Sequence, residues 1–306
     1  FRLAQFRDKE GFTRKSRFLI NHGGFAVQAI YGRATACLRA GGCCIDRDGL
    51  SPADLHDLAI SHYAIMPLAL DRLLRALPAD FSPLPDLTIA TFGARLPETL
   101  HHEALGRLAT RLVVSYGANE CGSIASLQSD GRGRILPGVE VEILDEHGQR
   151  ITGREGEIRL RSPALVTGYE DDAAATAARF RQGWFHPGDR GLIDDAGGLW
   201  LTGRSDDQIN IGGRKLMPQQ LEAQIGDLLG RRDLCVLALP DGTGRDQLVI
   251  ALVVASQQEL DQACRKLAPH LSADLGQVRI EAIDAIPLGE GGKPDRPKLA
   301  ARLAEG

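Results

Sequence analysis

Short apolar runs, each followed by a turn that contains glycine, constrain the first part of the chain more than any other feature. Gly93 follows the run Leu87–Ala90, and Gly117 follows Leu112–Val114. Each run has the length of a buried strand, and leucines at helical spacing, as in Leu70–Leu77, lie upstream. Strands that alternate with helices form mainly parallel sheets, whose ligand sites lie at strand ends. The sequence therefore predicts an α/β unit built on a parallel sheet.

The pattern changes between about Arg134 and Leu201. Val139–Leu144 and Glu157–Leu160 alternate between polar and apolar residues, and turn sequences such as Asp145–Gly148 separate the alternating segments. Alternation is typical of strands with one buried face, which pair in antiparallel order. This region is predicted to add an antiparallel, β-barrel-like layer to the parallel sheet.

A third pattern begins after Gly203. A short strand leads to a helix that starts at Pro218, a pair of strands follows, and a capping box opens another helix at Ser256. This arrangement indicates a small α+β domain. The predicted organisation is therefore a larger α/β domain over residues 1–203 and a small α+β domain over residues 204–306.

Composition excludes several classes of protein. The formal charge of -4 provides no broad basic field, which argues against nucleic acid as the main partner. No apolar run approaches the roughly 20 residues that span a bilayer, and no signal peptide is evident. The 6 cysteines lack the spacing of a disulfide framework or zinc site, so reduced thiols in a cytoplasmic protein are expected. Because the chain starts at Phe1 without an initiator Met, we expect a fragment.

Two turns carry residues suited to nucleotide binding. In Tyr116–Glu120, a glycine allows close backbone approach to a ligand, an aromatic ring can cover a base, and a carboxylate can hold Mg²⁺ on phosphates. In Gly183–Asp189, the carboxylate of Asp189 can accept hydrogen bonds from a ribose diol. A strand-ending turn without chemistry and an Asx turn remain the respective alternatives.

Two later segments are rich in glycine and basic residues. Leu201–Pro218 is predicted to form a polar hairpin before a helix, which a simple surface turn would also explain. Ile286–Arg296 is a glycine-rich loop with Lys293 near the carboxyl end. Its ammonium group could neutralise developing phosphate charge, although a frayed tail with one lysine is the alternative.

Taken together and in this order, the segments resemble the motifs of the adenylate-forming enzymes, which include acyl- and aryl-CoA synthetases, adenylation domains of peptide synthetases and luciferases. The matching segments are Tyr116–Glu120, Leu136–Val139, Gly168–Tyr169, Gly188–Asp189, Gly203–Ile209 and Gly291–Arg296. The resemblance extends from about residue 15 to the end of the chain. It implies a large domain that ends at residue 203 and a small mobile domain over 204–306.

The resemblance also implies roles for individual residues. Gly93, Ala94 and Tyr116 would wall the adenine, and Gly117 would also belong to the nucleotide site. Glu120 would hold Mg²⁺, and Asn119 would lie near the α-phosphate. Asp189, with Arg204 beside it, would bind the ribose, and Asp206 would be the hinge of the small domain. Lys293 would reach the acyl carboxylate and the α-phosphate, Gly212 and Gly213 would line the thiol channel, and His22 would lie near the acyl pocket. The implied ligands are ATP, Mg²⁺, a carboxylic acid, and CoA or a carrier protein.

Several residues depart from the family pattern. Asn119 stands where a Thr is common, Pro187 replaces a Thr before Gly-Asp, and Asn210 stands where a Lys is common. The Ser/Thr/Gly-rich phosphate loop of the family is absent from this sequence, so we expect the 306-residue chain alone to form no acyl-adenylate. The expected function is that of an AMP-forming acyl-CoA synthetase. A domain that loads a carrier protein and an inactive nucleotide-binding homologue are the alternatives.

Overall fold

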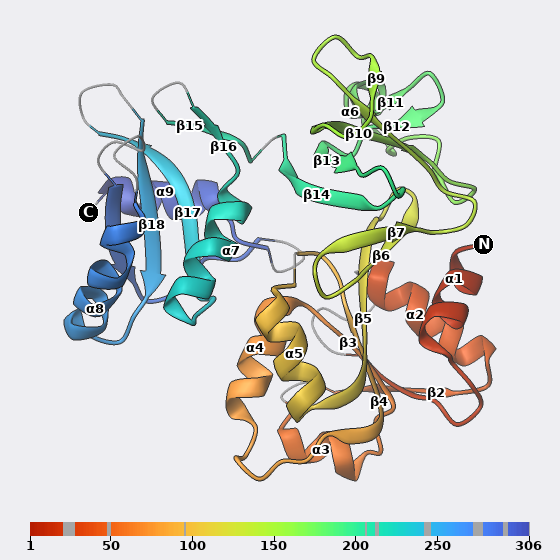
Figure 1. The fold of residues 1–306 in the computed structure, drawn as a ribbon. Helices are drawn as coiled ribbons and strands as arrows, with labels where there is room; N and C mark the ends of the chain where they lie inside the picture. The colour runs from red at the N-terminus through yellow and green to blue at the C-terminus, as the bar shows by residue number, and fades with distance from the viewer. Residues whose placement is uncertain are drawn as a thin grey trace. The chain divides into compact units, whose positions relative to one another are not determined.

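The computed structural model describes residues 1–20, 28–47, 50–94, 96–205, 207–211, 214–241, 246–271, 278–289 and 293–305 (Figure 1). The chain divides into two compact units, Phe1–Leu201 and Thr202–Gly306. Each unit has hydrophobic clusters of its own, and the two are described separately below. Their assignment to a large and a small mobile domain of the adenylate-forming enzymes stays a prediction.

The first unit begins with parallel strands in the order β2–β1–β3–β4–β5. Their bounds are β1 (Arg17–Ile20), β2 (Cys43–Asp46), β3 (His62–Ile65), β4 (Leu84–Thr91) and β5 (Ala109–Ala118). The runs Leu87–Ala90 and Leu112–Val114 lie inside β4 and β5, which confirms the two strands expected from sequence. The parallel pairing also confirms the predicted sheet type.

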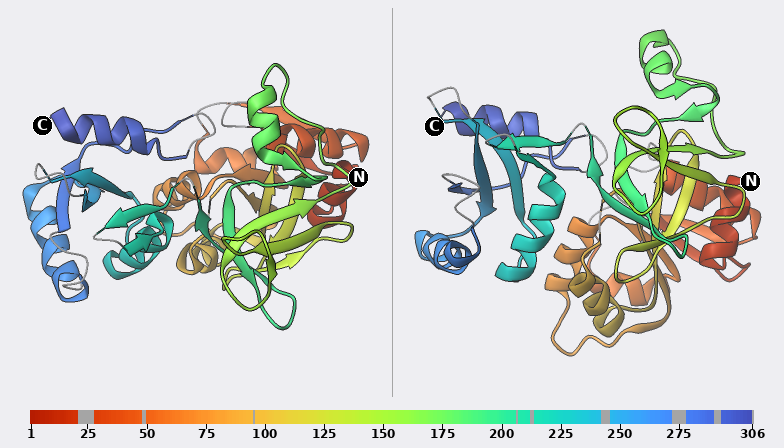
Figure 2. Two further views of the ribbon diagram at one scale, coloured as in Figure 1. Left: turned by 90° about the horizontal axis from the view of Figure 1, so that it is seen from above. Right: turned by 45° about the horizontal axis from the view of Figure 1, so that its top comes forward.

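Helices cover both faces of this parallel part, as Figure 2 shows. Their bounds are α1 (Arg2–Glu10), α2 (Gln28–Arg39), α3 (Pro52–Asp57), α4 (Pro67–Ala76) and α5 (Glu98–Arg107). Alternate residues of β1 point to opposite faces, so Leu19 packs in the cluster of α3, α4 and α5, whereas Phe18 and Ile20 pack in that of α1 and α2. Burial on both faces explains why these strands are continuous apolar runs rather than alternating ones.

The start of α3 follows the capping signal in its sequence. The Ser51 hydroxyl accepts a hydrogen bond from the Asp54 backbone N–H, and the Asp54 carboxylate accepts one from the Ser51 backbone N–H. The helix ends at Asp57, and Leu58 is its carboxyl-terminal cap. Ala59 then has a positive φ of 46°, which turns the chain toward β3.

The antiparallel strands that follow continue the same sheet, and the last of them runs past Leu201, where the first unit ends. Their bounds are β6 (Gly122–Leu127), β7 (Arg132–Ile135), β8 (Glu140–Leu144), β9 (Arg150–Ile151), β10 (Gly156–Arg161), β11 (Phe180–Arg181), β12 (Trp184–Phe185), β13 (Asp189–Ile193) and β14 (Leu199–Arg204), with the helix α6 (Ala173–Arg179) before β11. β6 pairs with β5 and then with β7, which joins both parts into one mixed sheet of 14 strands among the described residues. The expected antiparallel strands are present, and the pairing of β6 with β5 makes them continuous with the parallel part of the sheet.

The second unit is a small α+β structure. Its elements are the hairpin β15 (Ile209–Ile211) and β16 (Arg214–Leu216), the sheet strands β17 (Leu234–Pro240), β18 (Asp246–Val253) and β19 (Val278–Ile283), the helices α7 (Pro218–Leu229), α8 (Gln257–Leu267) and α9 (Arg296–Glu305), and the short 3₁₀ helix η2 (Ala268–His270). α7 and α8 pack on one face of the three-stranded sheet, and α9 packs on the other. Pro218 opens α7 and Ser256 caps α8, as the sequence predicts.

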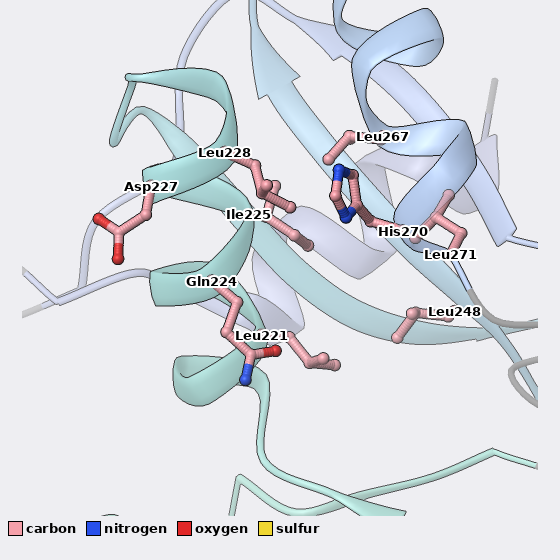
Figure 3. Close-up of a pocket in the computed structure, with 9 residues that line it drawn as sticks. All are labelled: Leu221, Gln224, Ile225, Asp227, Leu228, Leu248, Leu267, His270 and Leu271. Carbon is pink, nitrogen blue, oxygen red and sulfur yellow. The ribbon is translucent and has the colours of Figure 1, made fainter.

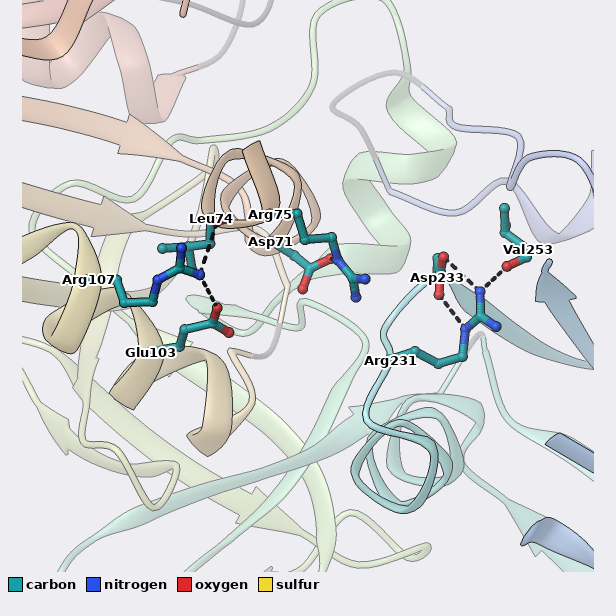
Figure 4. A network of polar contacts seen from close by, with 8 residues as sticks. All are labelled: Asp71, Leu74, Arg75, Glu103, Arg107, Arg231, Asp233 and Val253. Atoms are coloured by element: carbon teal, nitrogen blue, oxygen red, sulfur yellow. Dashed lines mark hydrogen bonds and ion pairs between the residues drawn. The ribbon is translucent and has the colours of Figure 1, made fainter. Parts of the chain in front are cut away.

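Arginine side chains tie neighbouring elements together inside each unit (Figure 4). Arg107 of α5 donates to the backbone carbonyl of Leu74 in α4 at 3.3 Å and to Glu103 at 3.1 Å. In the second unit, Arg231 donates to Asp233 at 2.7 Å and to the carbonyl of Val253. The first set of contacts joins α5 to α4, and the second ties the segment after α7 to the end of β18.

Candidate functional site

The candidate nucleotide site begins at the carboxyl edge of the parallel strands. β3, β4 and β5 lie side by side in register, with Ile65 opposite Thr91 and Thr91 opposite Val114. The turns that follow them are therefore neighbours, and a Cβ on Gly93 after β4 would lie 3.8 Å from the sulfur of Met66 after β3. Gly93 and Ala94 are exposed at this edge. Since Gly93 has a φ of +85°, its backbone conformation is what requires glycine.

Gly117 has a different reason to be glycine. It lies where β5 turns into β6, and a Cβ there would come within 2.5 Å of the backbone oxygen of Gly122 on the neighbouring strand. The sequence suggested that this glycine lets the backbone approach a ligand. The structure shows that the hairpin itself leaves no room for a side chain.

Tyr116 and Asp189 are joined by a hydrogen bond, although 73 residues separate them. The Tyr116 hydroxyl donates to Oδ2 of Asp189 at 2.5 Å, and both side chains are half-buried. Tyr116 comes from the end of β5, and Asp189 is the first residue of β13. An aromatic ring suited to a base and a carboxylate suited to a diol are thus held beside each other.

Glu120 lies four residues beyond Tyr116, in the turn between β5 and β6, and is half-buried. Its carboxylate oxygen Oε1 accepts a hydrogen bond of 2.7 Å from the Tyr169 hydroxyl. Asn119, next to it, is exposed. Tyr169 belongs to the Gly-Tyr motif noted in the sequence, which assigned it no role.

Lys293 is exposed on a loop that is closed at its base. The Gly289 N–H donates to the Lys293 carbonyl at 2.9 Å, and Leu288 and Pro294 form an antiparallel bridge. The Asp295 N–H donates to the Pro287 carbonyl at 2.8 Å, just before α9 begins. These bonds do not fit the alternative of a frayed tail, because the backbone on both sides of the loop is tied.

Comparison with known proteins assigns the chain to a family. Residues 19–170 match the family model described as AMP-binding enzyme. The chain belongs to the AMP-binding enzyme family. This membership confirms the resemblance to adenylate-forming enzymes that the motifs indicate.

The curated relatives of this AMP-binding enzyme chain are acid–CoA ligases. It is 28% identical over 211 residues to the medium/long-chain-fatty-acid–CoA ligase FadD8 of Mycobacterium tuberculosis, covering 66% of this chain and 37% of that protein. It is 26% identical over 298 residues to the indoleacetate–CoA ligase of Aromatoleum aromaticum, covering 91% of this chain and 58% of that protein. The chain thus spans about half the length of the relatives it matches.

Solved structures agree on the fold. The anthranilate CoA ligase AuaEII, in complex with anthranoyl-AMP, aligns with a TM-score of 0.81 at 20% identity, over 99% of this chain and 63% of that one. The ATP-bound RpMatB-BxBclM chimera B3 aligns with a TM-score of 0.81 at 21% identity, over 99% and 63%. At these identities the likeness shows the mixed α/β fold alone.

The residues at this edge of the AMP-binding unit fit a magnesium ion that arrives with a nucleotide. Among the described residues, no group of three His, Cys, Asp or Glu side chains could enclose a metal. Mg²⁺ in nucleotide sites usually takes one or two carboxylates and completes its shell with phosphate oxygens and water. The single carboxylate of Glu120, which accepts a hydrogen bond from Tyr169, suits that arrangement.

Four of the residues to which the family resemblance gives a role lie outside the described residues: His22, Asp206, Gly212 and Gly213. Arg204 ends β14 and belongs to the second unit, so its place beside Asp189 stays a prediction.

His186, in the Gly183–Asp189 segment, is buried in a polar cluster. Its Nδ1 lies 3.0 Å from a Glu157 carboxylate oxygen and 2.8 Å from an Arg181 nitrogen. Burial lowers the pKa of the imidazole, against the opposing effect of Glu157. These contacts indicate a packing role for His186.

Of two cavities among the described residues, one is lined by no candidate site residue and the other is bordered by Tyr169. An apolar cavity of about 540 Å³ in the second unit lies between α7 and α8 and contains none of the predicted site residues (Figure 3). Another of about 800 Å³ is lined by residues 167–173, 176 and 177, and Tyr169 borders it. No helix among the described residues is long and apolar enough to cross a membrane.

Proposed function

We propose that this chain takes part in the AMP-forming activation of a carboxylic acid and its transfer to the thiol of CoA. The hydrogen bond between Tyr116 and Asp189 carries the proposal, because it places an aromatic ring suited to a base beside a carboxylate suited to a ribose diol. Glu120, in the next turn, supplies a carboxylate for the phosphates. The acid–CoA ligases among the relatives support this reaction class.

The proposed reaction has two steps. In the first, an oxygen of the substrate carboxylate attacks the α-phosphorus of ATP, and the bond to the bridging oxygen breaks to release pyrophosphate. In the second, the sulfur of CoA attacks the acyl carbon, the thiol loses its proton, and AMP leaves with the electrons of the broken C–O bond. Neither step forms a covalent bond to the protein, so positioning and charge neutralisation provide most of the catalysis.

The chain's own residues would divide this work. Gly93, Ala94, Tyr116 and Gly117 would wall the adenine, Asp189 would accept the ribose hydroxyls, and Asn119 would donate near the α-phosphate. Glu120 would hold Mg²⁺, which when bound neutralises charge on the phosphates. Lys293 would neutralise the charge that develops between the acyl carboxylate and the α-phosphate.

A binding experiment tests the ribose assignment. We expect Asp189→Ala to weaken binding of AMP to the chain by about 1.5–3 kcal/mol, because a charge-assisted hydrogen bond is lost. Titration calorimetry with AMP measures the effect, and 2′,3′-dideoxy-AMP supplies the second arm. The wild-type protein should bind the dideoxy analogue more weakly than AMP, whereas Asp189→Ala should not distinguish them.

The matched control is Asp195→Ala, which removes an exposed carboxylate from a turn of the same unit. It should leave both affinities unchanged. If Asp189→Ala lost affinity equally for AMP and for the dideoxy analogue, Asp189 would not contact the ribose. If the wild-type chain bound no adenine nucleotide, the proposed function would be wrong.

The role of Lys293 is tested by separating the half-reactions in the whole protein that carries this chain. Lys293→Ala should slow pyrophosphate exchange into ATP by about 10²–10³-fold, because a cation is removed from the adenylation transition state. Thioester formation from a supplied acyl-adenylate should be nearly unchanged. Lys298→Ala, which removes an exposed lysine from α9, is the control and should affect neither half-reaction. Equal loss of both half-reactions in Lys293→Ala would contradict the assignment.

A further inference from the structure

Glu120 is held at both its main chain and its side chain by segments distant in sequence. From this arrangement we propose that Tyr169 is a positioning residue that orients the Glu120 carboxylate for the magnesium ion of bound Mg·ATP. The inference rests on the proposed function, since it presumes that Glu120 faces the nucleotide's metal. It adds a residue to which neither the motifs nor the comparisons assign a role.

The main chain of Glu120 is anchored from two sides. Its carbonyl oxygen accepts a hydrogen bond of 3.0 Å from the Arg2 guanidinium and one of 2.9 Å from the Val166 N–H. The same nitrogen of Arg2 also donates to the Ala164 carbonyl at 2.6 Å, which ties the segment before Tyr169 to the β5–β6 turn. With the backbone fixed, the direction of the carboxylate depends on what its side chain contacts.

Tyr169 makes that contact and is itself held in place. Its hydroxyl donates to Glu120 Oε1 at 2.7 Å, and its backbone N–H donates to the Thr176 hydroxyl at 2.8 Å. Its ring packs edge-on against Phe180, with the ring centroids 5.5 Å apart. A Cβ on Gly168 would lie 2.6 Å from a Thr176 methyl carbon, so the glycine allows this close packing.

The chemistry of the pair suits a metal ligand and its supporting residue. A carboxylate has about four acceptor positions, and the Tyr169 hydroxyl occupies one of them on Oε1. Mg²⁺ requires near-octahedral oxygen ligands, so it is sensitive to the direction of a carboxylate. Loss of a group that orients a metal ligand typically reduces metal affinity 10–100-fold.

The test compares nucleotide affinity with and without magnesium in the chain. Mg²⁺ should strengthen ATP binding to the wild-type protein, measured by titration calorimetry in Mg²⁺ and in EDTA. In Tyr169→Phe, which keeps the ring and removes the hydroxyl, this enhancement should fall by about 10–100-fold. Metal-free binding of AMP should be unchanged, because Tyr169 does not contact the nucleoside in this proposal.

Further variants separate positioning from folding. Thr176→Val removes the hydroxyl that holds the Tyr169 backbone and should cause a smaller loss of the enhancement. Tyr116→Phe should change AMP affinity but leave the enhancement as in the wild type. In a Glu120→Gln background, Tyr169→Phe should have no further effect, since the two residues act through one ligand.

Three results would overturn the proposal. One is a Tyr169→Phe protein in which Mg²⁺ enhances ATP binding as much as in the wild type. Another is a Tyr169→Phe protein that loses metal-free AMP binding as strongly as it loses the enhancement, which would indicate a merely structural role. The third is a wild-type chain that binds AMP without any enhancement of ATP binding by Mg²⁺. Failure of the proposed function is distinct, because the wild-type chain would then bind neither nucleotide.

Discussion

At the scale of single residues, two glycines with the same sequence context have different reasons to be glycine. Gly93 follows β4 and adopts a φ of +85°, and a Cβ there would make only ordinary van der Waals contact with Met66. Gly117 sits in the β5–β6 hairpin, where a Cβ would meet the Gly122 oxygen at 2.5 Å. At the first position the backbone conformation requires glycine. At the second position the close approach of the neighbouring strand requires it.

This difference leads to a prediction about Gly117→Ala. We expect the free energy of unfolding to fall by about 1–3 kcal/mol, because the added methyl group forces the two strands apart. Gly106→Ala is the control: Gly106 lies exposed in α5 with nothing within 4 Å of a Cβ, and the change should stabilise by about 0.5–1 kcal/mol. Urea unfolding measures both. Equal effects of the two variants would contradict the steric reading of Gly117.

At the scale of elements, one cluster of charged residues joins three elements of the second unit. The Glu222 carboxylate of α7 accepts hydrogen bonds from the Val236 N–H of β17 at 2.9 Å and from Arg296 of α9 at 2.6 Å. Arg296 also donates to the Val236 carbonyl at 3.1 Å and lies 3.8 Å from Asp207. Because Arg296 is the first residue of α9, this cluster anchors the helix that follows the Lys293 loop.

Removing the cation from this cluster should destabilise the second unit. Arg296→Met keeps a long apolar side chain but leaves the Glu222 carboxylate, whose side chain is 18% exposed, with the Val236 N–H as its remaining partner among these contacts. We expect a loss of about 3 kcal/mol in the free energy of unfolding. Arg302→Met, an exposed position on the same helix, should stay within about 0.5 kcal/mol of the wild type. Similar losses in both variants would show that the cluster contributes nothing specific.

At the scale of the whole molecule, histidine side chains buried in the described part of the first unit make the stability depend on pH. His62 stacks on Phe12 at 4.4 Å, and its Nε2 lies 2.9 Å from the Glu10 carbonyl oxygen, an arrangement that fits a neutral ring donating from Nε2. Burial lowers the pKa of His62, and it also lowers the pKa of His186. The unfolded chain therefore binds protons more readily than the folded one just below the ordinary histidine pKa.

The sign of the resulting pH dependence follows directly. The contribution of these buried histidines to the free energy of unfolding is fully present above about pH 6.5, the histidine pKa in the unfolded chain. It is lost as the pH falls toward the lowered pKa values of the folded protein. For each pKa unit by which folding lowers a histidine pKa, this contribution to the free energy of unfolding is about 1.4 kcal/mol. Urea midpoints measured between pH 7.5 and 5.5 should therefore decrease with acidification. His62→Gln should flatten this dependence, whereas replacement of the exposed His147 by Gln should not; an unchanged slope in His62→Gln would refute the prediction.

The sequence by itself determined the features that depend on neighbouring residues along the chain. The apolar runs of β4 and β5, the Pro218 start of α7 and the capping residue Ser256 could all be predicted, because local backbone preference and side-chain capping decide them. The motifs also indicated the family before any geometry was known.

Only the tertiary structure decided which of these residues meet. The bond between Tyr116 and Asp189 spans 73 residues of sequence, and that between Tyr169 and Glu120 spans 49. No spacing rule relates such pairs. They come together only when β10 and β13 join the sheet that contains β5. The continuity of the mixed sheet and the steric reason for Gly117 likewise depend on pairing between strands. Packing of distant segments, rather than local preference, therefore creates the arrangement of the candidate site.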